Sequence, residues 1–175
     1  AHLPVATRVR RLLVASAVLF QLPLARADEA EQILGALGLG PGMFAADVGA
    51  GEGRFTTALA RQVGATGRVY ATEVEQDKLA EIQEKAKGDG LANVRTVLGD
   101  QNGTGLPEAC CDAILLRLVY HHFTDPSAMR RSLWSALKPG GRLLVVEVTP
   151  QSGWRQLEGV PERGGHGIPA PELIA

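Results

Sequence analysis

Three glycines, Gly49, Gly51 and Gly53, stand at alternate positions shortly after the acidic Asp47. Glycine loses more conformational freedom on folding than any other residue, so this density needs a reason. Without side chains, Gly49 and Gly51 let a turn pass beneath a ligand, and Gly53 lets the following helix lie close to the preceding strand. The helix start adds unpaired N–H groups and a partial positive field. The segment therefore predicts a loop that binds a nucleotide-like ligand.

The spacing of these glycines argues against two other nucleotide loops. A phosphate loop would end in Gly-Lys-Ser/Thr, which is missing here. A dinucleotide loop has the spacing G-x-G-x-x-G, but Arg54 occupies the position of its third glycine. A nicotinamide-dependent oxidoreductase is thus a disfavoured alternative.

Two further carboxylates close the next two expected strands, Glu73 at the end of 67–74 and Asp100 at the end of 93–100. An acid at the first position can accept hydrogen bonds from both ribose hydroxyls, and one at the second could meet an adenine amino group. A lone acid at a strand end is usually just solvated. A glycine loop, Glu and Asp at three successive strand ends favour one nucleoside site.

The elements that must position these residues alternate along the chain from residue 28. Strands are expected over 43–49, 67–74, 93–100, 111–119 and 141–148, and helices over 28–37, 56–63, 76–87 and 125–138. Asp125 is the expected N-cap of the last helix, with Pro126 at its first position and Pro139-Gly140-Gly141 at its end. This order predicts an α/β fold, a Rossmann-like doubly wound, mostly parallel sheet with helices on both faces.

The composition describes one globular domain after a distinct N-terminal segment. The chain has 175 residues, a net charge of -1 and no basic stripe, so no nucleic-acid partner is expected. Residues 1–27 contain four arginines and no acid. Basic residues, the apolar run 12–24 and an Ala-Arg-Ala triplet form a secretory signal pattern, and the run is too short for a stable membrane span.

The expected division is therefore 1–27 as a signal-like segment and 28–175 as a single domain. The protein is expected to be exported or periplasmic if that segment is a signal peptide, and cytoplasmic otherwise. A twin-arginine signal, an ordinary apolar helix and a mitochondrial presequence are the open alternatives.

Cys110 and Cys111 are adjacent, at the mouth of an apolar run. Neighbouring cysteines rarely pair with each other, and the two lack the spacing of a zinc site. They are expected to pack in the core or at its edge, with thiol chemistry as the lesser alternative. No metal site is expected.

Five segments together, DVGAGEGRF, VYATEVE, VLGD, CDAILLRLVYHHFTDP and LKPGGRLLVVE, resemble the class I S-adenosylmethionine-dependent methyltransferases. The resemblance covers residues 28–150. It implies S-adenosylmethionine as cofactor and methyl transfer to a small-molecule acceptor. The resemblance implies that Asp47, Gly49 and Gly51 surround the methionine part of the cofactor, with Gly53 completing the loop. It places Glu73 at the ribose, Asp100 at the adenine, and Val74 and Gln101 beside the adenine ring. Arg117 and Leu118 would lie near the carboxypropyl group and the sulfonium.

Methyl transfer from a sulfonium needs a base only when the nucleophile carries a proton that must leave. His121 and His122, just past the fourth strand, are the candidate catalytic residues. The alternative is that one caps the loop while the other packs beneath it. Tyr120, Arg117 and Trp154 are candidate substrate contacts, and His166 lies in the late loop.

The resemblance also predicts what is missing. The family's sheet has seven strands, and this chain ends before the last two. Strand 141–148 should then carry an open edge, left by truncation, covered by the late loop or paired in a homodimer. A non-catalytic protein that keeps the fold is the alternative function. An exported protein would also leave the cytosol, where S-adenosylmethionine is made.

Overall fold

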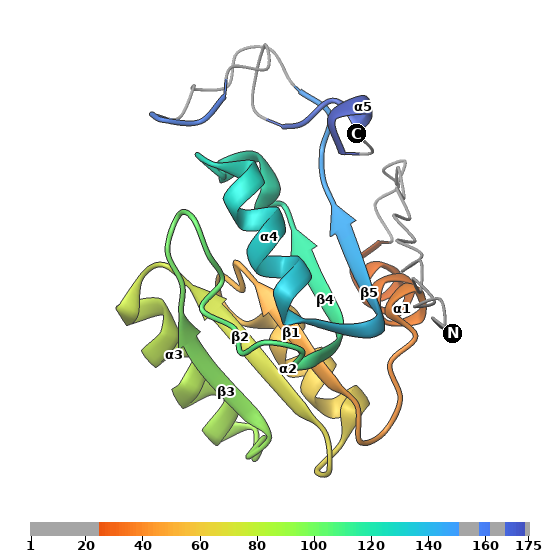
Figure 1. Cartoon of the computed structure of the whole chain (residues 1–175). Coiled ribbons are helices and arrows are strands. Elements are labelled where there is room, and N and C mark those ends of the chain that lie inside the picture. Colours follow the sequence, from red (N-terminus) through yellow and green to blue (C-terminus); the bar gives the residue numbers. More distant parts are fainter. Residues whose placement is uncertain (1–24, 151–157, 162–166, 174–175) are drawn as a thin grey trace, which may run out of the picture.

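The computed structural model describes residues 25–150, 158–161 and 167–173 (Figure 1). One parallel sheet has the strand order β3-β2-β1-β4-β5. The strands are β1 (Phe44–Val48), β2 (Arg68–Glu73), β3 (Val94–Leu98), β4 (Cys111–Arg117) and β5 (Leu137–Val146). The helices are α1 (Ala25–Leu37), α2 (Arg54–Val63), α3 (Gln76–Gly88), the 3-10 turn η1 (Tyr120–His122), α4 (Pro126–Ala136) and α5 (Ala170–Leu173). The strand order reverses between β1 and β4, and the predicted doubly wound α/β class is confirmed.

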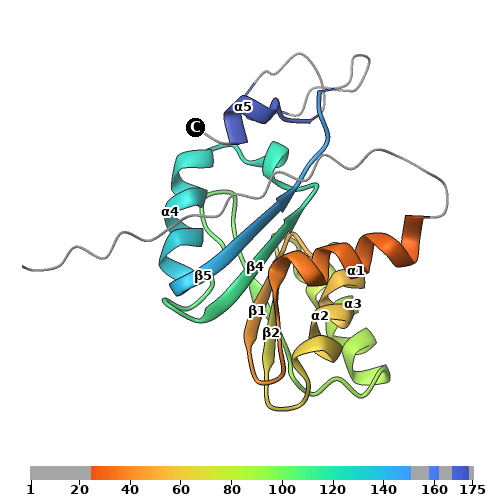
Figure 2. The same ribbon diagram turned by 90° about the vertical axis from the view of Figure 1, so that its right-hand side faces the viewer.

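Helices cover both faces of the sheet. Figure 2 shows α1, α2 and α3 on one face and α4 on the other. On β1, Ala45 packs with the first group of helices, whereas Ala46 and Val48 pack with α4. Strands buried on both faces read as continuous apolar runs, which is why the sequence shows no polar alternation there.

The junction between α4 and β5 differs from the prediction. Asp125 caps α4 as expected, and its Oδ1 accepts a hydrogen bond from the backbone N–H of Ala128 at 2.9 Å. The helix ends at Ala136, however, and not at the Pro-Gly-Gly turn, because Leu137 is already extended and paired with Cys111 of β4. The β4–β5 register shifts between Cys111 and Ala113, so a bulge accommodates the proline, which cannot donate a ladder hydrogen bond.

The expectation that the adjacent cysteines do not pair with each other is wrong. Cys110 and Cys111 are joined by a disulfide, although neighbouring cysteines rarely pair. Their expected packing is confirmed, since Cys111 is fully buried and Cys110 is 8% exposed. Ala109, directly before them, has a left-handed backbone with φ 47°, which is unusual for a residue with a side chain.

β5 forms one edge of the sheet as described, and its pairing partner there is β4. Beyond the end of β5, Ile168 is buried and donates its N–H to the carbonyl of Val148 at 2.9 Å. The later chain therefore contacts the chain just past this strand. The homodimer stays a prediction. Trp154 and His166 lie outside the described residues. Within the described ranges, no helix is both long and apolar enough to cross a bilayer.

Candidate active site

The glycine loop joins β1 to α2 at the carboxyl edge of the sheet. Gly49, Gly51 and Gly53 have φ of 69°, 56° and 69°, a region that side chains disfavour. A side chain at Gly49 would collide with Val119, and one at Gly53 would crowd Ile82 of α3. At Gly51 it would meet no atom within 4 Å. The loop thus faces open space at Gly51, whereas the outer two glycines allow close packing beneath it.

Asp47 is a buried carboxylate near the end of β1, just before this loop, with 3% of its surface exposed. Its Oδ2 accepts a hydrogen bond from the Thr56 hydroxyl at 2.7 Å. Burial raises the pKa of Asp47 to about 6, while the hydrogen bonds from Thr56 oppose that rise. Thr56 was not singled out from the sequence, although a polar residue in the first turn of a buried helix is a usable signal.

Glu73 lies at the end of β2 and faces the loop. Its Oε1 accepts the backbone N–H of Gly51 at 2.6 Å, and its Oε2 accepts that of Val74 at 3.2 Å. The carboxylate is therefore held beside the glycine that faces open space. Val74 is 56% exposed and follows directly.

Asp100 follows β3 and is exposed. Its Oδ1 accepts the backbone N–H groups of Asn102 and Gly103 at 2.7 and 2.8 Å, which organises the turn after it. Gln101 is exposed within this turn, and its Oε1 accepts a hydrogen bond from the Thr124 hydroxyl at 3.4 Å. The adenine contacts of Asp100 and Gln101 stay predictions.

Arg117 ends β4 and Leu118 follows it, beside the glycine loop. Arg117 donates to Glu29 of α1 at 2.7 Å, and Glu29 also pairs with Arg54 at 3.5 Å. Leu118 has φ 55°, and its N–H bonds the carbonyl of Val146 at 2.8 Å. Such rare backbone conformations concentrate at functional sites. No feature of the sequence pointed to Glu29.

The two candidate catalytic histidines have different surroundings. The Nδ1 of His121 lies 2.7 Å from Oε2 of Glu147, just past β5, and both side chains are almost fully buried at 3% and 2% exposed. Glu147 also accepts the backbone N–H groups of His121 and Val148, both at 3.3 Å. His122 is exposed, with its ring 4.1 Å from that of His121. The sequence signal that could have identified Glu147 is an acidic residue within the otherwise apolar segment 141–148.

Tyr120, a predicted substrate contact, is 5% exposed and packs in the α4 side of the core. Its hydroxyl accepts a hydrogen bond from Arg130 of α4 at 2.9 Å. Its role toward a substrate stays a prediction.

The residues described above thus lie along one edge of the sheet, at the ends of β1, β2, β3, β4 and β5. The carboxylates at this edge suit an adenosyl sulfonium. They can accept hydrogen bonds from ribose hydroxyls and from the cationic amino group of its methionine part.

Comparison with known proteins identifies the class. A family model described as a methyltransferase domain matches residues 46–145, more than half of the chain, and the chain belongs to this family. A SAM dependent methyltransferase from Aquifex aeolicus is 28% identical and superposes with a TM-score of 0.65 over 84% of this chain and 72% of its own. A SAM-dependent O-methyltransferase from Thermotoga maritima is 28% identical, with a TM-score of 0.55 over 66% of this chain and 42% of its own. The resemblance and its cofactor, S-adenosylmethionine, are confirmed.

Among curated proteins, the ubiquinone/menaquinone biosynthesis C-methyltransferase UbiE of Enterobacter sp. (strain 638) is 33% identical over 111 residues, 63% of this chain. The matched region covers 44% of the full length of that relative, so the chain spans less than half of it.

Proposed function

We propose that this domain binds S-adenosylmethionine at the carboxyl edge of β1, β2 and β4 and transfers its methyl group to a small-molecule acceptor. The observation that carries the proposal is the open space at Gly51, bounded by the Glu73 carboxylate bonded to its N–H. The similarity to UbiE supports a small acceptor, because that relative is named for methylation in quinone biosynthesis.

Each residue has a distinct part in this proposal. When bound, S-adenosylmethionine supplies an electrophilic methyl group on a sulfonium. Glu73 would accept hydrogen bonds from the ribose hydroxyls, and Asp47 would hold negative charge near the cationic amino group. Alignment in a dry site lowers the barrier to an in-line displacement. His121, oriented by Glu147, takes the proton of an acceptor that must lose one.

Binding and transfer are tested separately. Calorimetry should show micromolar binding of S-adenosylhomocysteine and none of a nicotinamide dinucleotide; the reverse would make the oxidoreductase alternative correct. Incubation with isotopically labelled methyl donor and a small-molecule panel, read by mass spectrometry, should then reveal a labelled product. Binding without any labelled product would favour the non-catalytic alternative.

Replacing Glu73 with alanine is expected to weaken S-adenosylhomocysteine binding by about tenfold to a hundredfold, because two hydrogen bonds to a charged acceptor are lost. Glu75→Ala is the matched control, since Glu75 is exposed and its side chain makes no capping hydrogen bond to α3. Calorimetry measures both variants. Equal affinities of the two variants would remove Glu73 from the ribose role.

Export is proposed on the signal pattern of residues 1–27 alone. N-terminal sequencing of the protein secreted by, or retained in, a native host would show whether this segment is cleaved.

A further inference from the structure

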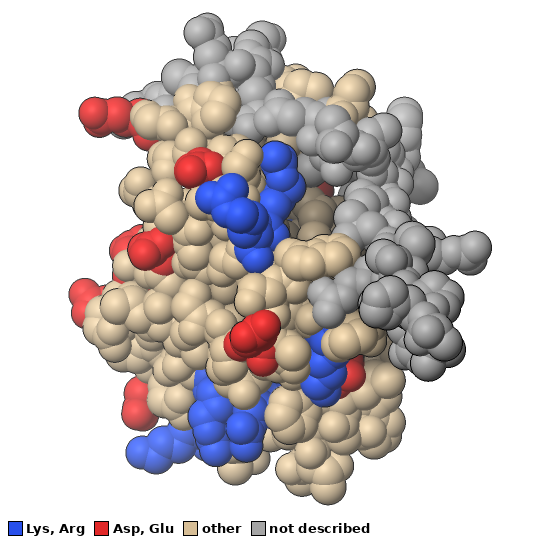
Figure 3. Space-filling model, viewed as in Figure 1, with Lys and Arg blue, Asp and Glu red and all other residues tan. Residues whose placement is uncertain are grey.

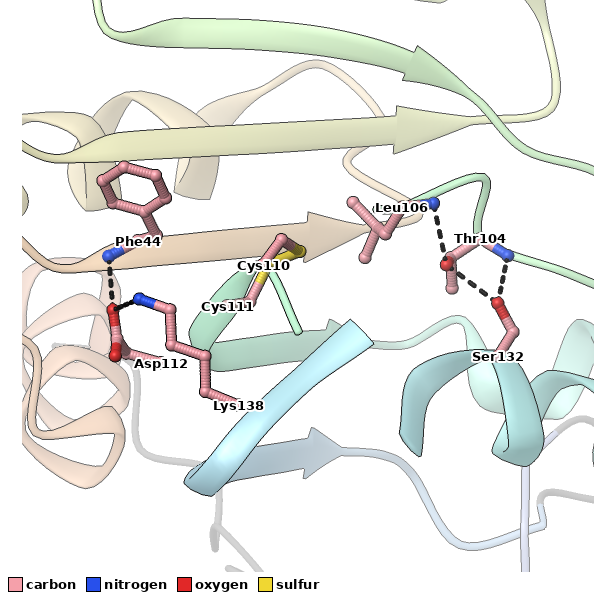
Figure 4. The surroundings of a disulfide bond; sticks show 8 residues. All are labelled: Phe44, Thr104, Leu106, Cys110, Cys111, Asp112, Ser132 and Lys138. Carbon is pink, nitrogen blue, oxygen red and sulfur yellow. Dashed lines mark hydrogen bonds and ion pairs between the residues drawn. A yellow bond between two sulfur atoms is a disulfide. The ribbon is translucent and has the colours of Figure 1, made fainter. Parts of the chain in front are cut away.

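The Cys110–Cys111 disulfide lies at the start of β4 (Figure 4). The candidate active site lies at the other end of this strand, after Arg117. Cys111 begins β4 and Arg117 ends it, a separation of roughly 20 Å at the usual rise of a strand. A disulfide stabilises a protein mainly by closing a chain loop, and a bond between neighbours closes none. A stabilising cross-link is therefore a poor account of this pair.

A groove lies beside the disulfide. Its volume is about 710 Å³, and it runs along α4 between that helix and the chain before β4. The residues that line the groove include Glu108, Ala109, Arg130, Arg131 and Leu137. Two of these residues adjoin the cysteines: Ala109 precedes Cys110, and Leu137 pairs with Cys111 in the sheet. The wall of the groove therefore includes the residue directly before Cys110 in the chain and the strand partner of Cys111.

The charge of the groove favours an anion. Two arginines and one glutamate line it. Figure 3 shows basic side chains gathered over α4 on this face of the molecule. Ala109, the part of the wall next to Cys110, has the strained left-handed backbone, and such strain concentrates at functional positions. Both cysteines belong to the core on the α4 side of the sheet, and Cys110 keeps 8% of its residue surface exposed against 0% for Cys111.

We propose that Cys110 and Cys111 form a thiol–disulfide exchange site for a small anionic thiol that enters through this groove. The incoming thiolate forms a bond to Sγ of Cys110 as the Cys110–Cys111 bond breaks, and the electron pair leaves on Sγ of Cys111, which takes a proton from water. A second thiolate attacks the non-protein sulfur of the mixed disulfide and releases Cys110, which is then protonated. Two small thiols are oxidised to one small disulfide, and the protein gains two electrons; the reverse reaction restores the pair.

Glutathione, an anionic thiol, is the probe. Maleimide labelling of the full chain, purified without reductant and read by intact mass, should add no label before treatment and two after millimolar reduced glutathione. Oxidised glutathione should return the protein to the unlabelled state. In Cys111→Ala, oxidised glutathione should add one glutathione, on Cys110. Two free thiols that oxidised glutathione fails to join would overturn the proposal.

The route of entry has its own test. Arg131→Gln should slow reduction by glutathione about threefold, because one positive charge of the groove is lost, and leave reduction by the neutral 2-mercaptoethanol unchanged. Lys87→Gln on α3, an exposed charge on the other face of the sheet, is the matched control. Equal rates with glutathione in the two variants would exclude entry through the groove.

Discussion

Replacing His121 with asparagine is expected to lower the rate of methyl transfer by about a hundredfold to ten-thousandfold, for an acceptor whose nucleophile carries a proton. The reason is positional, since His121 lies at the carboxyl edge of the sheet with its Nδ1 2.7 Å from Oε2 of Glu147. This contact at hydrogen-bond distance holds the imidazole ring in one orientation. The rate is measured with the acceptor found by the labelled-methyl search, and affinity for S-adenosylhomocysteine should stay within about twofold, because binding energy is not removed.

Glu147 acts through His121 and is a positioning residue. Glu147→Gln keeps the shape of the side chain and is expected to lower kcat by about tenfold or more and to change its pH profile. Glu158→Gln is the control, because Glu158 is exposed in the late segment. A merely structural pair would give a different result, namely a lower Tm with the pH profile of kcat unaltered. An unchanged rate in His121→Asn would exclude His121 as the base.

Replacing Asp47 with asparagine is expected to stabilise the protein while weakening cofactor binding. The folded protein holds the Asp47 proton up to a pKa of about 6, whereas the unfolded chain releases it near 3.8. Between these values the folded state binds more protons, so the free energy of unfolding falls as pH rises from about 4 to 6 and stays lower above that range. The ionised form thus costs on the order of 2–3 kcal/mol at pH 8.

Asparagine removes this cost and can still accept the Thr56 hydroxyl hydrogen bond. Urea unfolding at pH 8 should therefore show a gain of up to about 2 kcal/mol in the Asp47→Asn variant and a smaller loss of stability between pH 4 and 6. Its affinity for S-adenosylhomocysteine should fall about tenfold or more, since the negative charge beside the amino group is gone. Asp77→Asn, at an exposed position in the first turn of α3, is the control. Destabilisation of Asp47→Asn at pH 8 would show that the buried carboxylate is not penalised.

The sequence alone determined the features that depend on local rules. The alternation of apolar strands and amphipathic helices defined the parallel sheet, and the N-cap at Asp125 defined where α4 starts. Gly49, Gly51 and Gly53 marked a loop that needs left-handed backbone, and all three have it. The acids at strand ends could be assigned to one site because parallel strands bring their carboxyl ends to the same edge of the sheet.

Tertiary structure decided the pairings between distant segments. Glu147 meets His121 across 26 residues, and Glu29 meets Arg117 across 88. Neither contact follows from spacing, because each depends on which strands are neighbours and how α1 packs on them. The same holds at the end of α4, where pairing of Leu137 with Cys111 ended the helix before the expected turn. Burial decided the rest: the sequence shows that Asp47 is acidic, but only the packing around it sets the cost of its charge.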